Sequence, residues 1–186
     1  MRKKKKIIPI AMIGLSLFLF PLDVLAAEGK TTLEILPLNE KYPRIYAIND
    51  LDFGNHELTE YGKDIKATEN LTIKILDARL TSIPWDLQVN FSSLTQKSDS
   101  PLTNANISLK PGTVTTEKGQ ALKTYPLYQN LDEPIFQTVL RSDSNSAHGW
   151  ITYTINRDEI NLNFGKNNRV GEYQALNQWR FINAKF

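Results

Sequence analysis

Apolar and polar residues alternate along much of this chain, most cleanly over residues 85–91. There Trp85, Leu87, Val89 and Phe91 are separated by three polar residues. Four apolar positions at a period of two predict an antiparallel strand with one face in a core. Helical periodicity would place Trp85 and Leu87 on different faces, so the pattern favours a strand.

Shorter segments of the same kind recur, and turn-forming residues close most of them. They lie at residues 31–37, 51–54, 71–75, 105–109, 114–116, 135–140, 150–155 and 160–164, with a last one after Gly171 that runs through Phe181. Within residues 122–132, Pro126 argues for an edge strand or a loop. No segment has convincing helical periodicity. Many short strands closed by turns predict an all-β domain, a single β-sandwich of mostly antiparallel strands, immunoglobulin-like or barrel-like.

The first 26 residues follow another pattern. Basic residues fill positions 2–6, an apolar run extends from Ile7 to Phe20, and Val24 and Ala26 form a small-residue pair. This is the layout of a secretory signal peptide, so we expect cleavage after Ala26 and a domain of residues 27–186. The run is short for a bilayer, which needs about 20 apolar residues, so we expect no transmembrane span after cleavage. An uncleaved anchor is the alternative.

Loss of that segment changes the charge of the chain. The full sequence has 22 basic and 20 acidic residues, and without residues 1–26 it keeps 17 and 19, a net charge of −2. No basic run remains, so we expect no nucleic-acid partner. The absence of cysteine means that a secreted fold must rest on packing rather than on disulfides.

Candidate catalytic groups are few. The adjacent acids Asp132-Glu133 and Asp158-Glu159 would point to opposite faces of a strand, whereas a glycosidase needs two carboxylates roughly 5–10 Å apart across a cleft. We read both pairs as turn residues. Only two histidines are present, and they do not form a pair at the sequence spacing of metal ligands, so we expect no metal and no cofactor. A non-enzymatic role follows, with a secreted polysaccharide-active enzyme as the less favoured alternative.

Two tryptophan segments carry a family resemblance. Trp85-Asp86-Leu87 and Trp179-Arg180-Phe181 resemble the two motifs of the WxL domain of Gram-positive surface proteins. Further segments resemble the family in the same order, at residues 51–54, 70–73, 77–79, 105–109, 149–150, 160–162 and 171–176. The second motif departs from the family, because it has Phe181 in place of the usual leucine, and Lys185 replaces an expected proline. Phenylalanine keeps an apolar anchor but enlarges it.

The resemblance implies a secreted, non-catalytic protein that associates non-covalently with peptidoglycan at the cell wall surface. It also implies two protein partners, a membrane-anchored WxL-interacting protein and other WxL proteins. The last three residues, 184–186, form no apolar tail for covalent sorting, and no cysteine follows Ala26 for lipid attachment, so we expect non-covalent retention. A structural subunit of a surface complex without direct glycan binding is the alternative.

The motif residues admit two roles. Trp85 and Leu87 share one strand face, as do Trp179 and Phe181, so each pair could present an apolar surface to glycan. Their alternation with polar residues is more typical of a row that faces a core. We therefore predict that all four are core residues and that the two strands lie close enough for their aromatic rings to pack.

Four other aromatic residues are the possible binding residues. Trp150 follows a polar loop, where it could cap the core or contact a sugar, and the apolar character of Ile151 and Tyr153 favours the core. Tyr61, Tyr125 and Tyr128 are candidates because they lie near polar loops.

Overall fold

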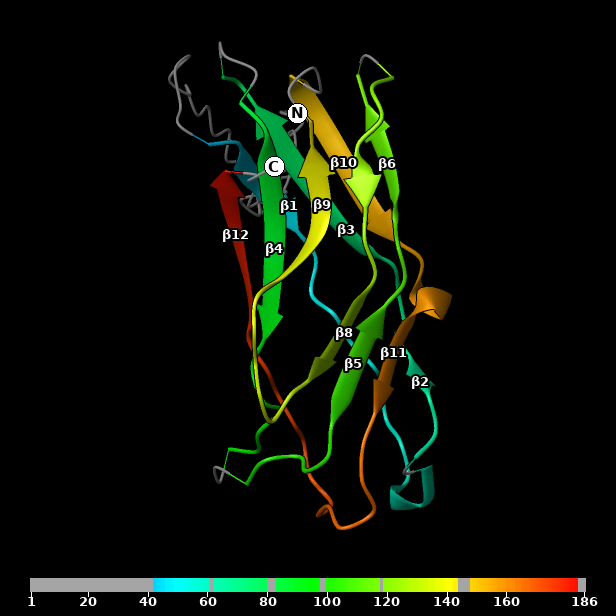
Figure 1. The fold of residues 1–186 in the computed structure, drawn as a ribbon. Coiled ribbons are helices and arrows are strands. Elements are labelled where there is room, and N and C mark those ends of the chain that lie inside the picture. The colour runs from blue at the N-terminus through cyan, green and yellow to red at the C-terminus, as the bar shows by residue number, and fades with distance from the viewer. Residues whose placement is uncertain are drawn as a thin grey trace, which may run out of the picture. The chain divides into compact units, whose positions relative to one another are not determined.

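The strands form three four-stranded antiparallel sheets (Figure 1). The computed structural model describes residues 42–60, 62–79, 83–97, 100–117, 119–143 and 148–183. The strand expected at residues 31–37 and the candidate Tyr61 lie outside these ranges. Within them, the only helical elements are two single 3-10 turns, η1 (Leu58–Glu60) and η2 (Arg157–Glu159). The all-β, antiparallel prediction is confirmed.

Sheet A is centred on two long paired strands. Its order is β1 (Arg44–Ile48), β3 (Leu71–Asp77), β10 (Gly149–Ile155) and β6 (Thr113–Thr116). β3 and β10 pair along their full lengths. Alternate side chains on both strands, such as Ile73, Ile75, Ile151 and Tyr153, are fully buried.

The buried Tyr153 makes stability depend on alkaline pH. Burial raises the pKa of Tyr153 to about 12, whereas a tyrosine in an unfolded chain titrates near 10. Above pH 10 the unfolded state therefore releases this proton before the folded state does, and stability falls as pH rises towards 12. We expect a loss of about 1 kcal/mol by roughly pH 11.

Denaturant unfolding between roughly pH 8 and pH 11 measures this loss. Tyr153→Phe should flatten the pH dependence, while Tyr128→Phe, at a tyrosine that is 67% exposed, should leave it unchanged. An equally steep profile in Tyr153→Phe would contradict the assignment.

Sheet B lies at the opposite end of the domain from sheet C in Figure 1. Its order is β2 (Ile65–Lys66), β11 (Ile160–Asn163), β5 (Asn106–Leu109) and β8 (Leu127–Asn130). The buried Gln129 joins it to sheet C, because its amide accepts from the Phe91 backbone N–H at 3.2 Å and donates to the Phe91 carbonyl at 2.6 Å. The side chain thus takes the place of a strand partner where the two sheets separate.

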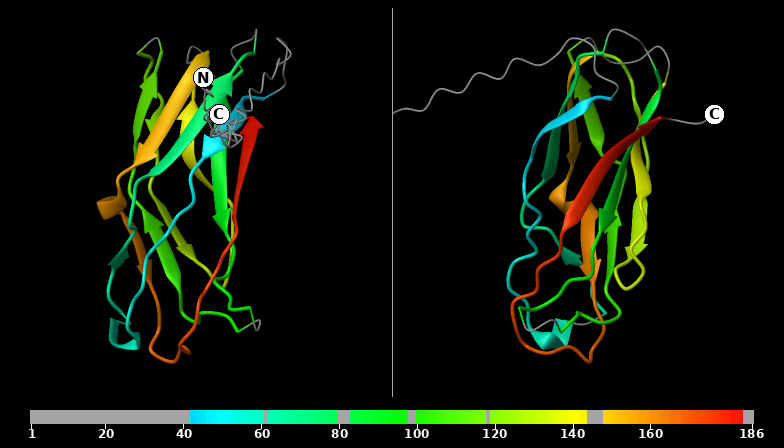
Figure 2. Two further views of the ribbon diagram at one scale, coloured as in Figure 1. Left: turned by 180° about the vertical axis from the view of Figure 1, so that it is seen from behind. Right: turned by 90° about the vertical axis from the view of Figure 1, so that its left-hand side faces the viewer.

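Sheet C contains both tryptophan motifs. Its order is β12 (Asn177–Asn183), β4 (Trp85–Phe91), β9 (Gln137–Ser142) and β7 (Lys123–Thr124). β12 pairs with β4 so that Phe181 lies opposite Leu87 and Trp179 opposite Val89. Sheet C faces the upper part of sheet A across one hydrophobic core, as the two views of Figure 2 show.

Three local expectations differ from the structure. Residues 51–54 form no strand: the Asp52 carboxylate accepts from the Gly54 N–H at 2.9 Å, and Gly54 has φ +75°. This Asx-type turn needs a glycine-like conformation and interrupts pairing. β1 was not predicted, because Tyr46 and Ile48 are exposed and give no core-facing pattern. The last strand begins at Asn177 rather than soon after Gly171, since the residues before it make only an isolated bridge between Gln174 and Thr95.

Candidate functional site

The first motif tryptophan is fixed in the core by a buried carboxylate. Trp85 is fully buried, and its Nε1 donates to Asp77 Oδ2 at 3.2 Å. The same carboxylate accepts two bonds of 2.8 Å from Arg79, and both charged residues are buried. Because a buried charge is stable only when paired and hydrogen-bonded, this triad joins the end of β3 to the start of β4.

The second motif lies on the edge strand β12 of sheet C. Phe181 packs edge-on against Trp85 with ring centroids 5.1 Å apart, so the two motifs meet in space. Trp179 is half-buried, and its Nε1 donates to Asn177 Oδ1 at 3.2 Å. Leu87 is fully buried. The four motif residues thus contribute to the core, two completely and two from the edge strand.

The middle residues of the motifs point the other way, onto the outer face of sheet C. On β4, Asp86 accepts from Arg141 Nε at 2.6 Å and from Arg141 Nη2 at 2.7 Å. The hydrogen bond to Asp86 raises the pKa of Arg141, which therefore stays charged. The hydroxyl of Thr138 also donates to Asp86, at 3.3 Å.

A β-bulge places Thr138 and Arg141 on this one face. Residues three apart on a regular strand point to opposite faces. Between β4 and β9 the register shifts, so that Leu87 lies opposite Leu140 but Gln88 lies opposite Thr138. The extra residue, Val139, is buried. A bulge of this kind redirects the side chains on either side of it.

Arg180 on β12 lies on the same outer face of sheet C. Its Nε donates to Gln88 Oε1 at 2.9 Å, and Gln88 Nε2 donates to the Thr138 hydroxyl at 3.3 Å. Its guanidinium carbon lies 3.8 Å from the centroid of the Phe136 ring. We call this surface the sheet C face and define it by Asp86, Gln88, Thr138, Arg141 and Arg180, with Phe136 and Tyr125 as its aromatic members.

The aromatic candidates are distributed over separate surfaces. Tyr125 lies on the sheet C face, where the Arg141 guanidinium is 5.5 Å from its ring centroid. Trp150 is 39% exposed on sheet A and packs edge-on against Tyr46 at 4.9 Å between centroids, so it is a surface residue rather than part of the core cluster. Tyr128 is exposed on β8.

Sequence reasoning missed Asp86, Gln88, Arg141 and Arg180 as site residues. Their only signal was that they occupy the polar positions of strands whose apolar positions form the core.

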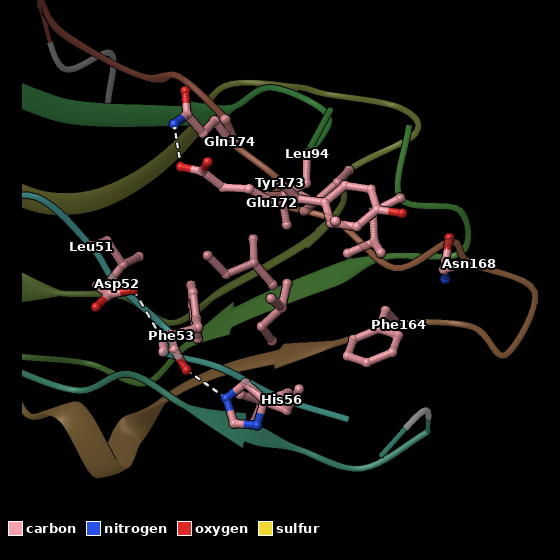
Figure 3. Close-up of a pocket in the computed structure, with 18 of the residues that line it drawn as sticks. Leu51, Asp52, Phe53, His56, Leu94, Phe164, Asn168, Glu172, Tyr173 and Gln174 are labelled. Atoms are coloured by element: carbon pink, nitrogen blue, oxygen red, sulfur yellow. Dashed lines mark hydrogen bonds between the residues drawn. The ribbon is translucent and has the colours of Figure 1, made fainter. Parts of the chain in front are cut away.

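The domain also has an open groove (Figure 3). It has a volume of about 1270 Å³ and runs between residues 50–57 and residues 168–177. Apolar side chains such as Phe53, Phe164 and Tyr173 line it. At its edge Glu172 accepts from Gln174 Nε2 at 2.9 Å, and Asp52 stabilises the turn at Gly54. Each of these two carboxylates is therefore engaged by a neighbouring residue of the chain.

The two histidines lie apart from the sheet C face and belong to no group of metal ligands in the described ranges. His56 Nδ1 lies 3.0 Å from Glu60, whose pKa is lowered mainly by a hydrogen bond from the Glu57 backbone. His148 lies near the start of β10. In the described ranges no three or more His, Asp or Glu residues gather where they could hold a metal ion. No helix in those ranges is long and apolar enough to span a bilayer.

The structure thus has an all-β fold with a half-buried polar face on sheet C, on which Asp86 is buried and Arg180 is exposed. A family comparison gives the protein a class. A family model described as WxL domain surface cell wall-binding matches residues 40–184. The chain belongs to the WxL family, and the resemblance of the two motifs is confirmed. The protein is therefore a cell-surface protein associated with the cell wall, from a family of binding domains rather than of enzymes. Searches of curated proteins and of solved structures returned no match.

Proposed function

We propose that this protein is a non-catalytic module that holds non-covalently to peptidoglycan through the sheet C face. The observation that carries the proposal is the array of fixed polar side chains between the rings of Tyr125 and Phe136. Asp86, Gln88 and Arg180 are held by hydrogen bonds to neighbours on the same face. Side chains fixed in this way lose little conformational freedom on binding, and rings beside them provide apolar surface for a sugar.

Secretion and the absence of catalysis are part of the same proposal. The basic, apolar and small-residue order of residues 1–26 supports a leader, with residues 27–186 as the wall-binding domain. The engagement of Asp52 and Glu172 in hydrogen bonds from Gly54 and Gln174 supports a binding role over acid–base chemistry. Release of soluble fragments from labelled wall material by the purified protein would contradict the non-catalytic role.

A second surface favours protein partners. Tyr46 and Trp150 are exposed on sheet A and pack edge-on against each other. Exposed apolar side chains that gather on one sheet face are typical of protein interfaces. We propose this surface for contact with a membrane-anchored WxL-interacting protein or with other WxL proteins.

Replacing Tyr125 by alanine should weaken wall binding. Loss of one ring from the sheet C face is expected to lower affinity roughly 3- to 10-fold, the equivalent of about 1 kcal/mol. The measurement is co-sedimentation of purified protein with sacculi freed of protein and teichoic acid. Tyr128→Ala is the matched control, because that exposed tyrosine lies on β8 of sheet B.

The wild-type result alone tests the wider proposal. Saturable binding supports direct wall contact. Failure of the folded wild-type protein to sediment would contradict it and leave a protein partner as the explanation for surface retention.

A further inference from the structure

The second motif places a charged side chain on the sheet C face. Trp179 and Phe181 pack against the core from β12, whereas Arg180 between them is exposed on the opposite side of the strand. Arg180 lies opposite Gln88 of β4 in the strand register. The apolar residues of the motif therefore anchor the strand that carries this guanidinium.

The guanidinium of Arg180 is fixed from two directions. The Nε of Arg180 donates to Gln88 Oε1 at 2.9 Å. The guanidinium carbon lies 3.8 Å from the centroid of the Phe136 ring. A guanidinium has five N–H donors, and the contact with Gln88 uses one. Among the residues that the structure describes, no acceptor is recorded for its Nη1 or Nη2. The Arg180 guanidinium is therefore held in one orientation, with an edge formed by the N–H groups of Nη1 and Nη2 available to donate to a ligand.

The neighbouring acid does not occupy that edge. Asp86 lies on the adjacent strand, but both of its oxygens accept from Arg141, and one also accepts from Thr138. Within the described sheet C face, the two arginines and one aspartate leave one positive charge in excess. The excess resides on Arg180, since Arg141 is neutralised by Asp86.

We propose that Arg180 is the anion-binding residue of the sheet C face and takes a carboxylate or phosphate oxygen of a wall polymer. The proposal rests on the proposed function, in which this face contacts the wall. The planar fork of a guanidinium matches both anions with two parallel hydrogen bonds, and an ammonium does not. The Phe136 ring stabilises the cation and keeps the fork in one plane. Peptidoglycan supplies carboxylates, and teichoic acid supplies phosphodiesters.

Co-sedimentation with two wall preparations distinguishes the two sources. The purified protein is mixed with sacculi that retain teichoic acid and with sacculi stripped of it. Arg180→Ala should lower affinity about tenfold or more, as expected for a lost charge-assisted pair. Arg180→Lys should regain only part of it. Arg157→Ala, at an exposed arginine on η2, should bind like wild type. A defect of Arg180→Ala on stripped sacculi identifies a carboxylate, and a defect confined to the unstripped ones identifies a phosphate.

Other outcomes separate this inference from the proposed function. If Arg180→Ala binds both preparations with the same affinity as wild type, the inference is overturned and the proposed wall binding stands. Absence of wild-type binding to either preparation would contradict the proposed function. Arg180 is then tested with soluble glycerol 3-phosphate and N-acetylmuramic acid, by following its Nε resonance in the wild-type protein. A saturable shift with either compound supports the inference, and no shift with both would overturn it.

Discussion

Replacement of Asp77 by alanine is expected to destabilise the domain by about 3–5 kcal/mol. The side chain is buried and accepts two hydrogen bonds from the Arg79 guanidinium, one from the Arg79 backbone N–H and one from the Trp85 indole. Its loss leaves the Arg79 guanidinium buried without a counter-charge and the indole N–H without an acceptor. Domains of this size have total stabilities of about 5–15 kcal/mol, so a large unfolded fraction is expected in mild denaturant. Urea unfolding followed by tryptophan fluorescence measures the change.

Two further variants isolate the cause. Asp158→Ala removes an exposed carboxylate that lies 3.9 Å from Arg157, and it should change stability by no more than about 0.5 kcal/mol. The double variant Asp77→Leu, Arg79→Leu removes both charges, and it should be more stable than Asp77→Ala, because an unpaired buried charge costs more than its absence. An unfolding midpoint of Asp77→Ala equal to that of wild type would show that the triad does not support the fold.

The fold was predictable where the apolar side chains of a strand face the core and its polar side chains face away from it. β4 alternates over its whole length, and its apolar positions are all buried. β1 was not predictable in this way, because most of its side chains are exposed and the strand has no buried apolar face to give a period of two. Residues 51–54 carry strand-like residues, but the hydrogen bond between Asp52 and Gly54 gives a turn that periodicity does not detect.

The sheet C face was less predictable than the core. Asp86 and Arg180 were visible as polar positions between apolar ones, but their shared surface depends on pairing between strands some 90 residues apart. The partnership of Asp86 with Arg141 depends in addition on the bulge in β9. Strand pairing between distant segments and local register shifts leave no periodic signal in one sequence. Tyr125 is a candidate from the sequence only as an aromatic residue near polar loops, and only the fold shows that it lies beside Arg141.

Trp85→Ala is expected to cost about 3–5 kcal/mol, because it removes a fully buried aromatic side chain. Trp179→Ala should cost less, about 1–2 kcal/mol, since that side chain is half-buried on an edge strand. Chemical unfolding of both variants tests this order, and equal costs would contradict it.

A comparison of Trp85→Ala with Arg180→Ala decides how the motifs contribute to wall binding. If Trp85 acts only through the fold, the binding lost by Trp85→Ala should equal the unfolded fraction of the sample, and conditions that restore folding should restore binding. Arg180→Ala should show the reverse, a binding defect with an almost unchanged unfolding midpoint, because its side chain is exposed. A binding defect in folded Trp85→Ala would mean that the core also determines the geometry of the sheet C face. Phe181 provides a direct route for such an effect, since it contacts Trp85 and is the neighbour of Arg180 on β12.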